Sequence, residues 1–450
     1  GQTDIWVLPI AGGAPLRLLN DITDERDPAW SPLPGDTRLA FASRQDGNWE
    51  LYIYDLTTQV TSRLTYDLSF QGNPKWSPDA EWIVYESYQG NNLDVYAVRV
   101  DGSQAPIRIT DHPAPDFSPS WSPSGREIAF VSLRDRAQDI YVFNLDTLET
   151  RNVTNTPLVN EDHPTWSPDG RYLAYSAIEQ GAEKVFVRRV DIPDQPAQVI
   201  SFGRTPAWSP DGNSLVFVVD AVDGTASYLY VHPFGREGAV ATEVYTVPLG
   251  TVRPDWTAQS IPPVILNSGG SDLSIREELY VEQIGTSTTG ASIGLQSLPD
   301  VQAQRPFLSD AVNDSFNALR ARVIVESGRD FIGQLDDAWW DLERRPEPGE
   351  DRRNWHMTGR AFSVARSAVL GFPPTIEVIR EDLGIDTYWR VYLRVSEDLQ
   401  AGQLGEPLRR LPWDFLSRTE GDVEAFNQGG RLRADVPSGY YIDLTLLAND

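Results

Sequence analysis

The tripeptide Trp-Ser-Pro occurs five times in this 450-residue chain, and the copies follow one another at nearly constant intervals. The copies begin at Trp30, Trp76, Trp121, Trp166 and Trp208, and a degenerate sixth copy contains Trp256. The intervals between these tryptophans are 46, 45, 45, 42 and 48 residues. A period of about 40–50 residues with strand-like content is typical of an array in which each unit buries one face against the next. The repeat therefore determines the architecture of residues 1–258, although it says little about chemistry.

Each unit has the same internal order. A Pro-x-Trp-Ser-Pro segment leads into a turn that usually ends in Asp-Gly or Ser-Gly, and an apolar strand such as Leu39–Phe41 follows. A second strand resembles Asp94–Tyr96, and a third ends in a pair such as Leu64-Thr65. Pro, Asp and Gly suit tight turns, whereas β-branched and aromatic residues suit strands. We expect each repeated tryptophan to pack between neighbouring units.

The two ends of the repeat region complement each other. Asp4–Leu8 matches the second strand of a unit and Leu16–Leu19 matches the third, whereas the unit at Trp256 supplies only early strands, through Ile261–Leu266. Joining the two ends closes a ring and hides its edges. We therefore predict a mainly β protein whose first part is a six-bladed β-propeller, closed by N- and C-terminal strands of the ring.

The Trp-Ser-Pro-Asp-Gly repeat resembles that of TolB-type propellers over residues 1–258. The resemblance implies a six-bladed ring in a bacterial envelope or extracellular setting. It also implies a protein-binding scaffold, since most members of that family are scaffolds, with substrate gates and a few enzymes as exceptions.

The stretches before each Pro-x-Trp vary most, and we expect them to be loops around the central channel on one face, where binding residues tend to lie. The candidate binding residues are Asp27, Asn73, Asp116, Asp162, His163, Arg204 and Arg253. Oxygen ligands converging there would suit calcium or magnesium. The alternative is a solvated surface with internal ion pairs. The two arginines favour internal pairing or capture of a carboxylate.

Composition excludes several classes of function. The formal net charge of −27 argues against nucleic-acid binding, and the absence of cysteine excludes disulfides and thiolate zinc sites. No apolar run reaches the length of about 20 residues needed to span a bilayer. The chain opens at Gly1 inside a repeat, which suggests a processed or trimmed product with any export signal upstream. We expect an exported protein that is periplasmic, on the cell surface or extracellular.

Composition changes after residue 258. Pro and Gly-rich segments suggest a linker and irregular connection over residues 259–300, followed by an α+β domain over residues 301–450. We predict a helix capped near Ser309 that runs through Val323, and a second helix over residues 331–342. Strands are predicted over residues 387–393 and 440–444.

The segment Trp355–Ser363 resembles the His-x-x-Gly-x-Ala-x-Asp motif of D-Ala-D-Ala carboxypeptidase-like zinc peptidases, and Arg329 and Gln334 resemble that family's upstream segment. In that family the His and the final Asp bind zinc together with a later His. Here Ser363 stands in the Asp position, and no histidine follows His356. A catalytic zinc site needs three protein ligands and an open position. We therefore predict a peptidase fold without the metal, whose degenerate cleft contains Arg329, Gln334, His356 and Ser363.

These observations favour a non-catalytic binding or scaffold protein of the envelope or exterior that docks protein partners and needs no cofactor. One alternative is a peptidoglycan-directed hydrolase or peptidase with a rearranged metal site. Another is a cation-dependent glycan binder that uses calcium at the channel.

Overall fold

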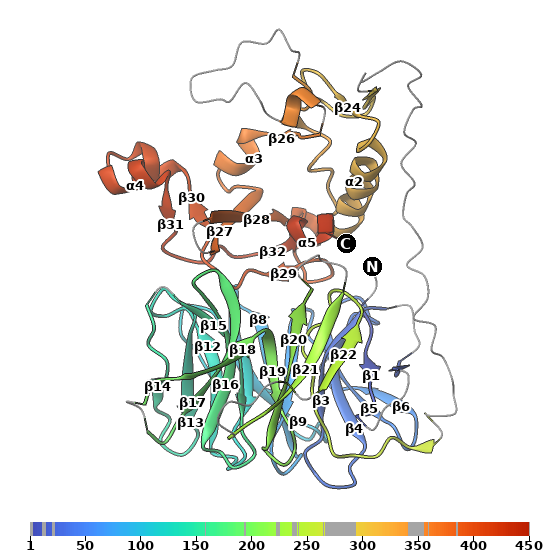
Figure 1. Cartoon of the computed structure of the whole chain (residues 1–450), viewed down its shortest axis with the longest axis vertical. Helices are drawn as coiled ribbons and strands as arrows, with labels where there is room; N and C mark the ends of the chain where they lie inside the picture. The colour runs from blue at the N-terminus through green and yellow to red at the C-terminus, as the bar shows by residue number, and fades with distance from the viewer. Residues whose placement is uncertain are drawn as a thin grey trace.

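A computed structural model describes residues 3–10, 15–19, 23–157, 159–192, 195–221, 226–235, 241, 243–263, 265, 294–340, 355–358, 360–383 and 386–449. The first part is a ring of antiparallel sheets, and the C-terminal part lies on one face of this ring (Figure 1). The protein is mainly β, as predicted, with few helices.

Five four-stranded sheets form five blades, each built from consecutive antiparallel strands. The first blade contains β3 (Glu25–Trp30), β4 (Arg38–Ser43), β5 (Glu50–Asp55) and β6 (Val60–Arg63). The second contains β7 (Gln71–Trp76), β8 (Trp82–Gln89), β9 (Asn92–Arg99) and β10 (Ile107–Arg108). The third contains β11 (Asp116–Trp121), β12 (Glu127–Ser132), β13 (Asp139–Asn144) and β14 (Thr150–Asn152). The fourth contains β15 (Asn160–Trp166), β16 (Tyr172–Glu179), β17 (Ala182–Arg189) and β18 (Gln198–Phe202), and the fifth contains β19 (Arg204–Trp208), β20 (Ser214–Asp220), β21 (Ser227–Pro233) and β22 (Glu243–Val247).

The sixth unit is built differently. The N-terminal strands β1 (Trp6–Val7) and β2 (Leu16–Arg17) pair with each other, but residues 248–263, which the structure describes, contain no strand. The closing strand predicted through Ile261–Leu266 is therefore not found in its described part. Pro262 and Pro263 have no backbone N–H to donate to a ladder, which explains this.

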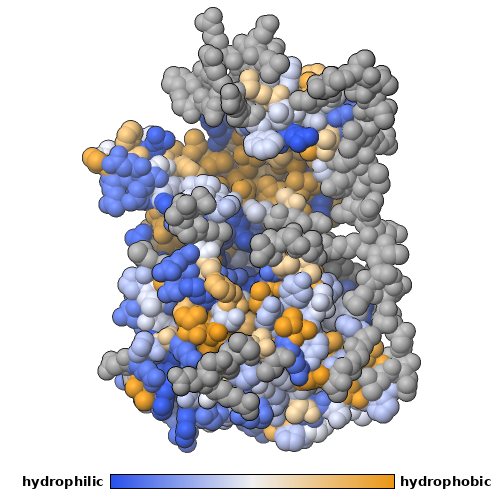
Figure 2. Space-filling view, in the orientation of Figure 1, coloured by the Kyte–Doolittle hydropathy of each residue, from blue (hydrophilic) through white to orange (hydrophobic). Residues whose placement is uncertain are grey.

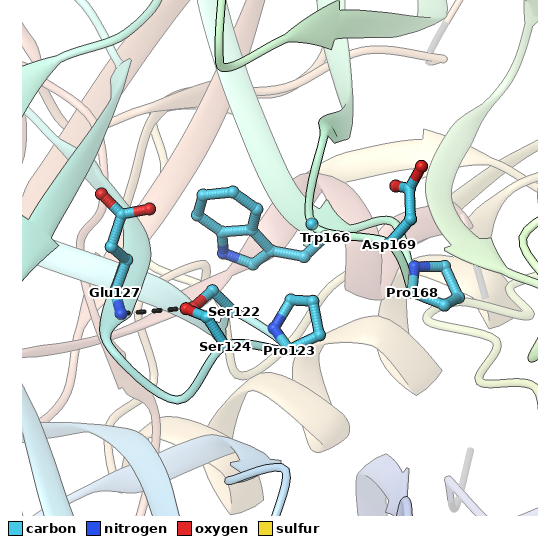
Figure 3. Close-up of a pocket in the computed structure, with 8 residues that line it drawn as sticks. Ser122, Pro123, Ser124, Glu127, Trp166, Pro168 and Asp169 are labelled. Carbon is cyan, nitrogen blue, oxygen red and sulfur yellow. Dashed lines mark hydrogen bonds between the residues drawn. The ribbon is translucent and has the colours of Figure 1, made fainter.

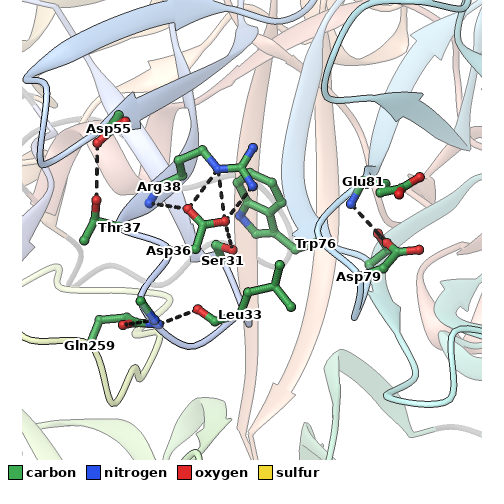
Figure 4. Close-up of polar contacts among 12 residues, drawn as sticks. Ser31, Leu33, Asp36, Thr37, Arg38, Asp55, Trp76, Asp79, Glu81 and Gln259 are labelled. Carbon is green, nitrogen blue, oxygen red and sulfur yellow. Dashed lines mark hydrogen bonds and ion pairs between the residues drawn. The ribbon is translucent and has the colours of Figure 1, made fainter.

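Side chains make the closing contacts instead. The Asp255 carboxylate accepts the backbone N–H of Trp30 at 2.8 Å. The Gln259 amide donates to the Leu33 carbonyl at 2.6 Å, as Figure 4 shows. Ile261 joins an apolar cluster with Ile5 of the N-terminal segment. The two ends of the repeat region therefore meet at the first blade, as the sequence predicts.

The repeated tryptophans connect neighbouring blades, as predicted. The indole N–H of Trp76 donates to the carbonyl of Ala29 at 2.8 Å, and Trp166 and Trp208 donate to Ser120 and Thr165, both at 3.2 Å. In each pair the acceptor is the residue directly before the tryptophan of the preceding blade. One hydrogen-bonded indole thus links each of these blades to the previous one.

The rest of the motif builds the turn. The hydroxyl of Ser77 donates to Asp79 at 2.5 Å and accepts the backbone N–H of Trp82 at 2.9 Å. The fourth and fifth blades repeat both contacts. Gly170 has φ +71°, and a Cβ added there would lie 3.3 Å from Pro123 of the preceding blade. Both the backbone and the neighbouring turn therefore favour glycine here, although Ala80 adopts the same left-handed conformation (φ 55°) at the equivalent position of the second blade.

The C-terminal part contains a four-stranded sheet with the order β27-β28-β32-β29. Its strands are β27 (Ile376–Leu383), β28 (Asp386–Arg394), β32 (Tyr440–Asp443) and β29 (Glu406–Pro407). Helices α2 (Asn313–Ser327), α3 (Arg366–Leu370), α4 (Val423–Gln428) and α5 (Leu444–Asn449) accompany it. Short two-stranded sheets pair β23 (Leu295–Ser297) with β24 (Phe307–Ser309), β25 (Leu335–Asp337) with β26 (Ser363–Val364), and β30 (Trp413–Asp414) with β31 (Arg431–Leu432).

The predicted helix through Val323 and both predicted strands are confirmed by α2, β28 and β32. The predicted cap near Ser309 is wrong, because the N-cap residue of α2 is Val312 and no side chain caps the helix. The helix predicted over residues 331–342 is wrong in its described part, because residues 335–337 form β25. That strand pairs with β26, and a tertiary partner of this kind overrides the helical pattern of the local sequence.

The tryptophan linkage gives a first prediction. Trp76→Phe keeps the aromatic ring but removes the indole donor to the carbonyl of Ala29, which is only 2% exposed and also lies opposite Ala40 in the strand ladder. We expect a loss of about 0.5–1.5 kcal/mol in the free energy of unfolding, measured by urea denaturation.

Trp121→Phe is the matched control. The indole N–H of Trp121 donates to Gly125 in its own turn, and Gly125 is half-buried, so water can replace the lost donor. Equal losses in the two variants would contradict the linking role of Trp76.

Candidate functional site

Six residues with left-handed backbone surround the mouth of the ring on the face that carries the C-terminal part. Each directly precedes the proline of a Pro-x-Trp segment. They are Asp27 (φ 58°), Asn73 (φ 50°), Ser118 (φ 49°), His163 (φ 55°), Thr205 (φ 48°) and Arg253 (φ 55°). This conformation is uncommon outside glycine and costs of order 1–3 kcal/mol for an unfavourable residue.

In the first five units the strand register shifts at this residue, which marks a β-bulge. We predicted that these stretches are loops, and this is wrong. In the first five units they belong to the first strand of the blade. These bulged strands contain many polar residues, and this composition led to the prediction of loops. Arg253 repeats the conformation in the sixth unit, although no strand forms there.

Three of the predicted site residues come together across the first, second and closing units. Asp27 is 4% exposed, forms an ion pair with Arg253 and accepts the backbone N–H of Asn73 at 3.0 Å. Burial would raise the pKa of Asp27, but Arg253 and then Arg26 hold it below its ordinary value. Asp27 is therefore an ionised carboxylate that neighbouring groups already satisfy.

Asp162 and His163 form a second group. The hydroxyl of Ser118 donates to Asp162 at 2.8 Å, and the backbone N–H of His163 donates to the same oxygen at 2.7 Å. Burial lowers the pKa of His163 despite the nearby Asp162 carboxylate, so the imidazole is neutral at neutral pH.

The last two predicted residues lie in separate pairs. Asp116 is fully buried and binds the guanidinium of Arg134 through both oxygens, at 3.0 and 3.1 Å. Arg204 pairs with Asp220 at 2.5 Å and donates to the Thr251 carbonyl at 3.1 Å. The seven residues predicted for the mouth therefore divide into four separate groups and do not form one open cluster.

The C-terminal part covers the mouth with charged side chains. Glu406 forms an ion pair with Arg26, and Arg409 binds Glu86 at 2.5 Å and Glu406 at 3.0 Å. Gln138 donates to the Arg409 carbonyl at 3.2 Å. Sequence reasoning missed these residues, because nothing in the local sequence places residues 406 and 409 beside the ring.

The electrostatics of this contact are those of a satisfied network. Burial disfavours the charged form of Glu406, but Arg26 and Arg409 hold its pKa well below the ordinary range. Burial likewise opposes the charge of Arg409, but Glu86 and Glu406 raise its pKa. Both side chains stay charged because each contacts opposite charges on the other part.

Aromatic contacts reinforce the docking. The rings of Tyr88 and Tyr440 meet edge to face at 5.2 Å between centroids. The Tyr88 hydroxyl accepts the backbone N–H of Gly439 at 2.7 Å, and the Tyr440 hydroxyl accepts that of Phe70 at 3.2 Å. One apolar cluster contains residues of both parts, including Tyr88 and Tyr440. Such shared burial favours a fixed relation between the parts.

The predicted cleft residues lie apart from the mouth. His356 Nε2 lies 3.0 Å from the Ser363 hydroxyl, and the imidazole stacks on Trp340 with centroids 4.7 Å apart. Arg329 lies 5.6 Å above the Phe331 ring, and Gln334 pairs with Gln302. Within the described residues, no three His, Cys, Asp or Glu side chains gather in a way that could hold a metal ion.

A surface pocket of about 400 Å³ lies on the opposite face, between the turns of the third and fourth blades. Figure 3 shows Ser122, Glu127, Trp166 and Asp169 around it. The hydroxyl of Ser122 is already used by Ser124 and by the backbone of Glu127. The Ser122 hydroxyl in this pocket therefore stabilises its own turn.

Comparison with known proteins identifies the ring. The sequence matches the TolB beta propeller domain over residues 1–112 and 104–259. The chain belongs to the TolB beta propeller domain family. The match covers the repeat region and ends at residue 259.

Individual relatives of this TolB-like chain are more distant. An uncharacterized protein of Agrobacterium fabrum is 32% identical over 123 residues, which are 26% of this chain and 41% of that protein. A Tol-Pal system protein TolB of Desulfosudis oleivorans is 29% identical over 72 residues, which are 16% of each chain. This chain therefore spans less than half the length of these relatives.

Several solved structures resemble part of this chain. TolB of Acinetobacter baumannii is 19% identical, with a TM-score of 0.45 over 54% of this chain and 62% of its own. Structures of an oligogalacturonate lyase and of peptidases also match about half of this chain. Likeness at this level carries no functional argument. Within the described residues, no helix has the length and apolarity needed to cross a bilayer.

The charged contact gives a second prediction. Arg409→Ala leaves Glu86, which is fully buried, without its arginine. We expect a loss of about 3–5 kcal/mol in the free energy of unfolding, measured by urea denaturation. The double variant Arg409→Ala/Glu86→Gln also removes the buried, unpaired charge of Glu86. It should recover most of the lost free energy of unfolding.

Arg126→Ala is the control for this prediction. It breaks a pair with Asp146 in which both side chains are mostly exposed, and should cost less than about 1 kcal/mol. Equal losses for Arg409→Ala and Arg126→Ala would show that the Arg409 pair is not a buried docking contact.

Proposed function

We propose that this protein is a non-catalytic scaffold of the cell envelope or exterior, which binds other proteins. In this proposal residues 1–258 form a six-bladed docking ring closed by the N-terminal strands. Residues 259–300 form a connection, and residues 301–450 form a second binding or assembly module. One relative is named a Tol-Pal system protein, which is compatible with an exported protein that works in an envelope assembly.

The observation that carries the proposal is the occupied mouth of the ring. Arg26 and Glu86 of the ring bind Glu406 and Arg409 of the second module, so this face already holds a protein segment. A ring that grips an extended segment through ion pairs is suited to organising modules. The predicted mouth residues are internally paired, which supports docking over the capture of a cation or glycan.

The second module offers an apolar surface. Apolar side chains gather in a hollow beside the sheet of the C-terminal part (Figure 2). Half-buried Val364, Val369, Val378 and Val391 belong to the apolar cluster of this region, and Leu370 on α3 is 41% exposed. A hollow of this character is suited to an apolar or extended protein segment.

A cross-linking experiment tests this function. The full chain is purified from its source envelope, cross-linked and analysed by mass spectrometry. We expect a complex with reproducible cross-links from one protein partner to the C-terminal part, and a purified partner should then bind the chain directly. Leu370→Asp should weaken that binding at least about tenfold, since it places a charge at an apolar contact.

Leu148→Asp is the control. Leu148 is 72% exposed on a hairpin of the third blade, away from the C-terminal part, and this variant should bind the partner as the original does. A free monomer without reproducible cross-links would contradict the scaffold proposal.

Metal analysis tests the enzyme alternative. In our proposal the His356–Ser363 hydrogen bond stands where the related peptidases hold zinc, so the chain should bind no stoichiometric zinc. Equilibrium dialysis with zinc should give the same result for the original chain and for His356→Ala. Stoichiometric zinc that is lost in His356→Ala would favour a peptidase with a rearranged site.

A further inference from the structure

The first three blades share a buried acidic motif at the start of their third strand. Each motif has a carboxylate that is at most 2% exposed and a threonine whose hydroxyl accepts the backbone N–H that follows the carboxylate residue, at 2.9–3.0 Å. The pairs are Glu50 with Thr65, Asp94 with Thr110, and Asp139 with Thr154.

An arginine neutralises the first two carboxylates. Arg63 binds Glu50 at 2.9 Å, and Arg108 binds Asp94 at 2.7 Å. Each arginine lies two residues before the threonine of its blade. In the third blade that position is Asn152, whose amide donates to Asp139 at 2.9 Å. Asp139 therefore has a neutral partner where its counterparts have a cation.

A second carboxylate lies in the same place. Glu161 of β15 is 1% exposed. Its carboxyl group accepts a hydrogen bond from the hydroxyl of Thr156 and another, at 2.8 Å, from the hydroxyl of Thr154. The Thr154 hydroxyl also lies 3.4 Å from Asp139, so one hydroxyl lies between the two carboxyl groups. In the second blade the position equivalent to Glu161, three residues before the proline of Pro-x-Trp, holds the neutral residue Gln71. In the third blade it holds Asp116, which forms an ion pair with Arg134.

Other charged and titratable groups around the pair do not neutralise it. They are Arg134, which is committed to Asp116, and Asp135, Tyr141, Tyr175, Glu179 and Arg188. Within the described part of the chain, no ion pair reaches Asp139 or Glu161. Burial raises the pKa of Glu161 to about 8, and the Asp139 carboxylate adds to this through its charge and a hydrogen bond.

We infer that Glu161 keeps its proton at neutral pH beside the Asp139 carboxyl group, and that this pair acts as a proton-sensitive joint between the third and fourth blades. Two neighbouring buried carboxylates without a cation are costly, whereas a proton on Glu161 removes one of the two like charges. Loss of the proton places two like charges in the seam and loosens it.

The joint lies next to the docking contact at the mouth. The backbone N–H of Glu161 donates to the Gln138 carbonyl at 2.8 Å, and the Gln138 side chain donates to Arg409 of the C-terminal part. A change in the seam therefore reaches the edge of the ring on which the second module rests. This extends beyond the proposed scaffold function, because it makes the docked state depend on pH.

The sign follows from linkage. The folded protein holds the proton of Glu161 more tightly than the unfolded chain, whose glutamate pKa is about 4.3. Stability from this group is therefore present at low pH and is lost as pH rises towards the folded pKa. Asp94 and Glu377 have pKa values raised to about 7 and contribute a similar trend, so the original chain alone is not diagnostic.

The test compares Glu161→Gln with the original chain by thermal unfolding from about pH 5 to about pH 9. Glutamine imitates the protonated acid and cannot lose a proton. The Tm of Glu161→Gln should therefore fall less than that of the original between about pH 5 and about pH 9, by several degrees. Asn152→Arg restores the arginine of the first two blades and should reduce the fall in Tm in the same way. Equal pH profiles for the original and both variants would overturn the inference.

Infrared spectroscopy keeps the inference testable if a variant fails to fold. At neutral pH the original chain should show the carbonyl band of a protonated carboxylic acid, which disappears above about pH 9. Asn152→Arg should reduce this band. A band that is unchanged in folded Asn152→Arg or Glu161→Gln would assign the proton to another group and contradict the joint.

Discussion

The hydrogen bond from a repeated indole to the preceding blade links three of the five described blades to their neighbours, and the arrangement of the ring builds on it. Trp76, Trp166 and Trp208 each reach the carbonyl that precedes the tryptophan of the blade before. Each sheet is complete by itself, so its faces need a neighbour to bury them. The indole supplies both apolar area and one directed bond, and thereby sets the spacing between blades.

The bulged first strands turn this regular ring into a platform. Left-handed backbone recurs at six equivalent positions and interrupts the strand ladder at five of them. Asp27 and Arg253 pair there across the closure, while Arg26 and Glu86 remain directed at the C-terminal part. The same local device therefore closes the ring and supplies the contacts that hold the second module.

Buried charge is managed differently from blade to blade. Glu50 and Asp94 have arginine partners, and Glu86 has Arg409 from the C-terminal part. Asp139 and Glu161 have hydroxyl and amide partners instead. Since burying a carboxylate without a cation favours its protonated form, small differences between repeats become differences in response to pH.

The sequence by itself determined the repeat, the turn chemistry and the packing of tryptophan between blades, because these depend on residues close together within each unit. It also predicted α2 and β28 from local patterns. It did not reveal that the variable stretches are bulged strands, or that Pro262 and Pro263 leave the closure to side chains. Only the tertiary structure decided that Glu406 and Arg409 cover the mouth, since residues 26 and 406 are brought together by chain topology and not by any local pattern.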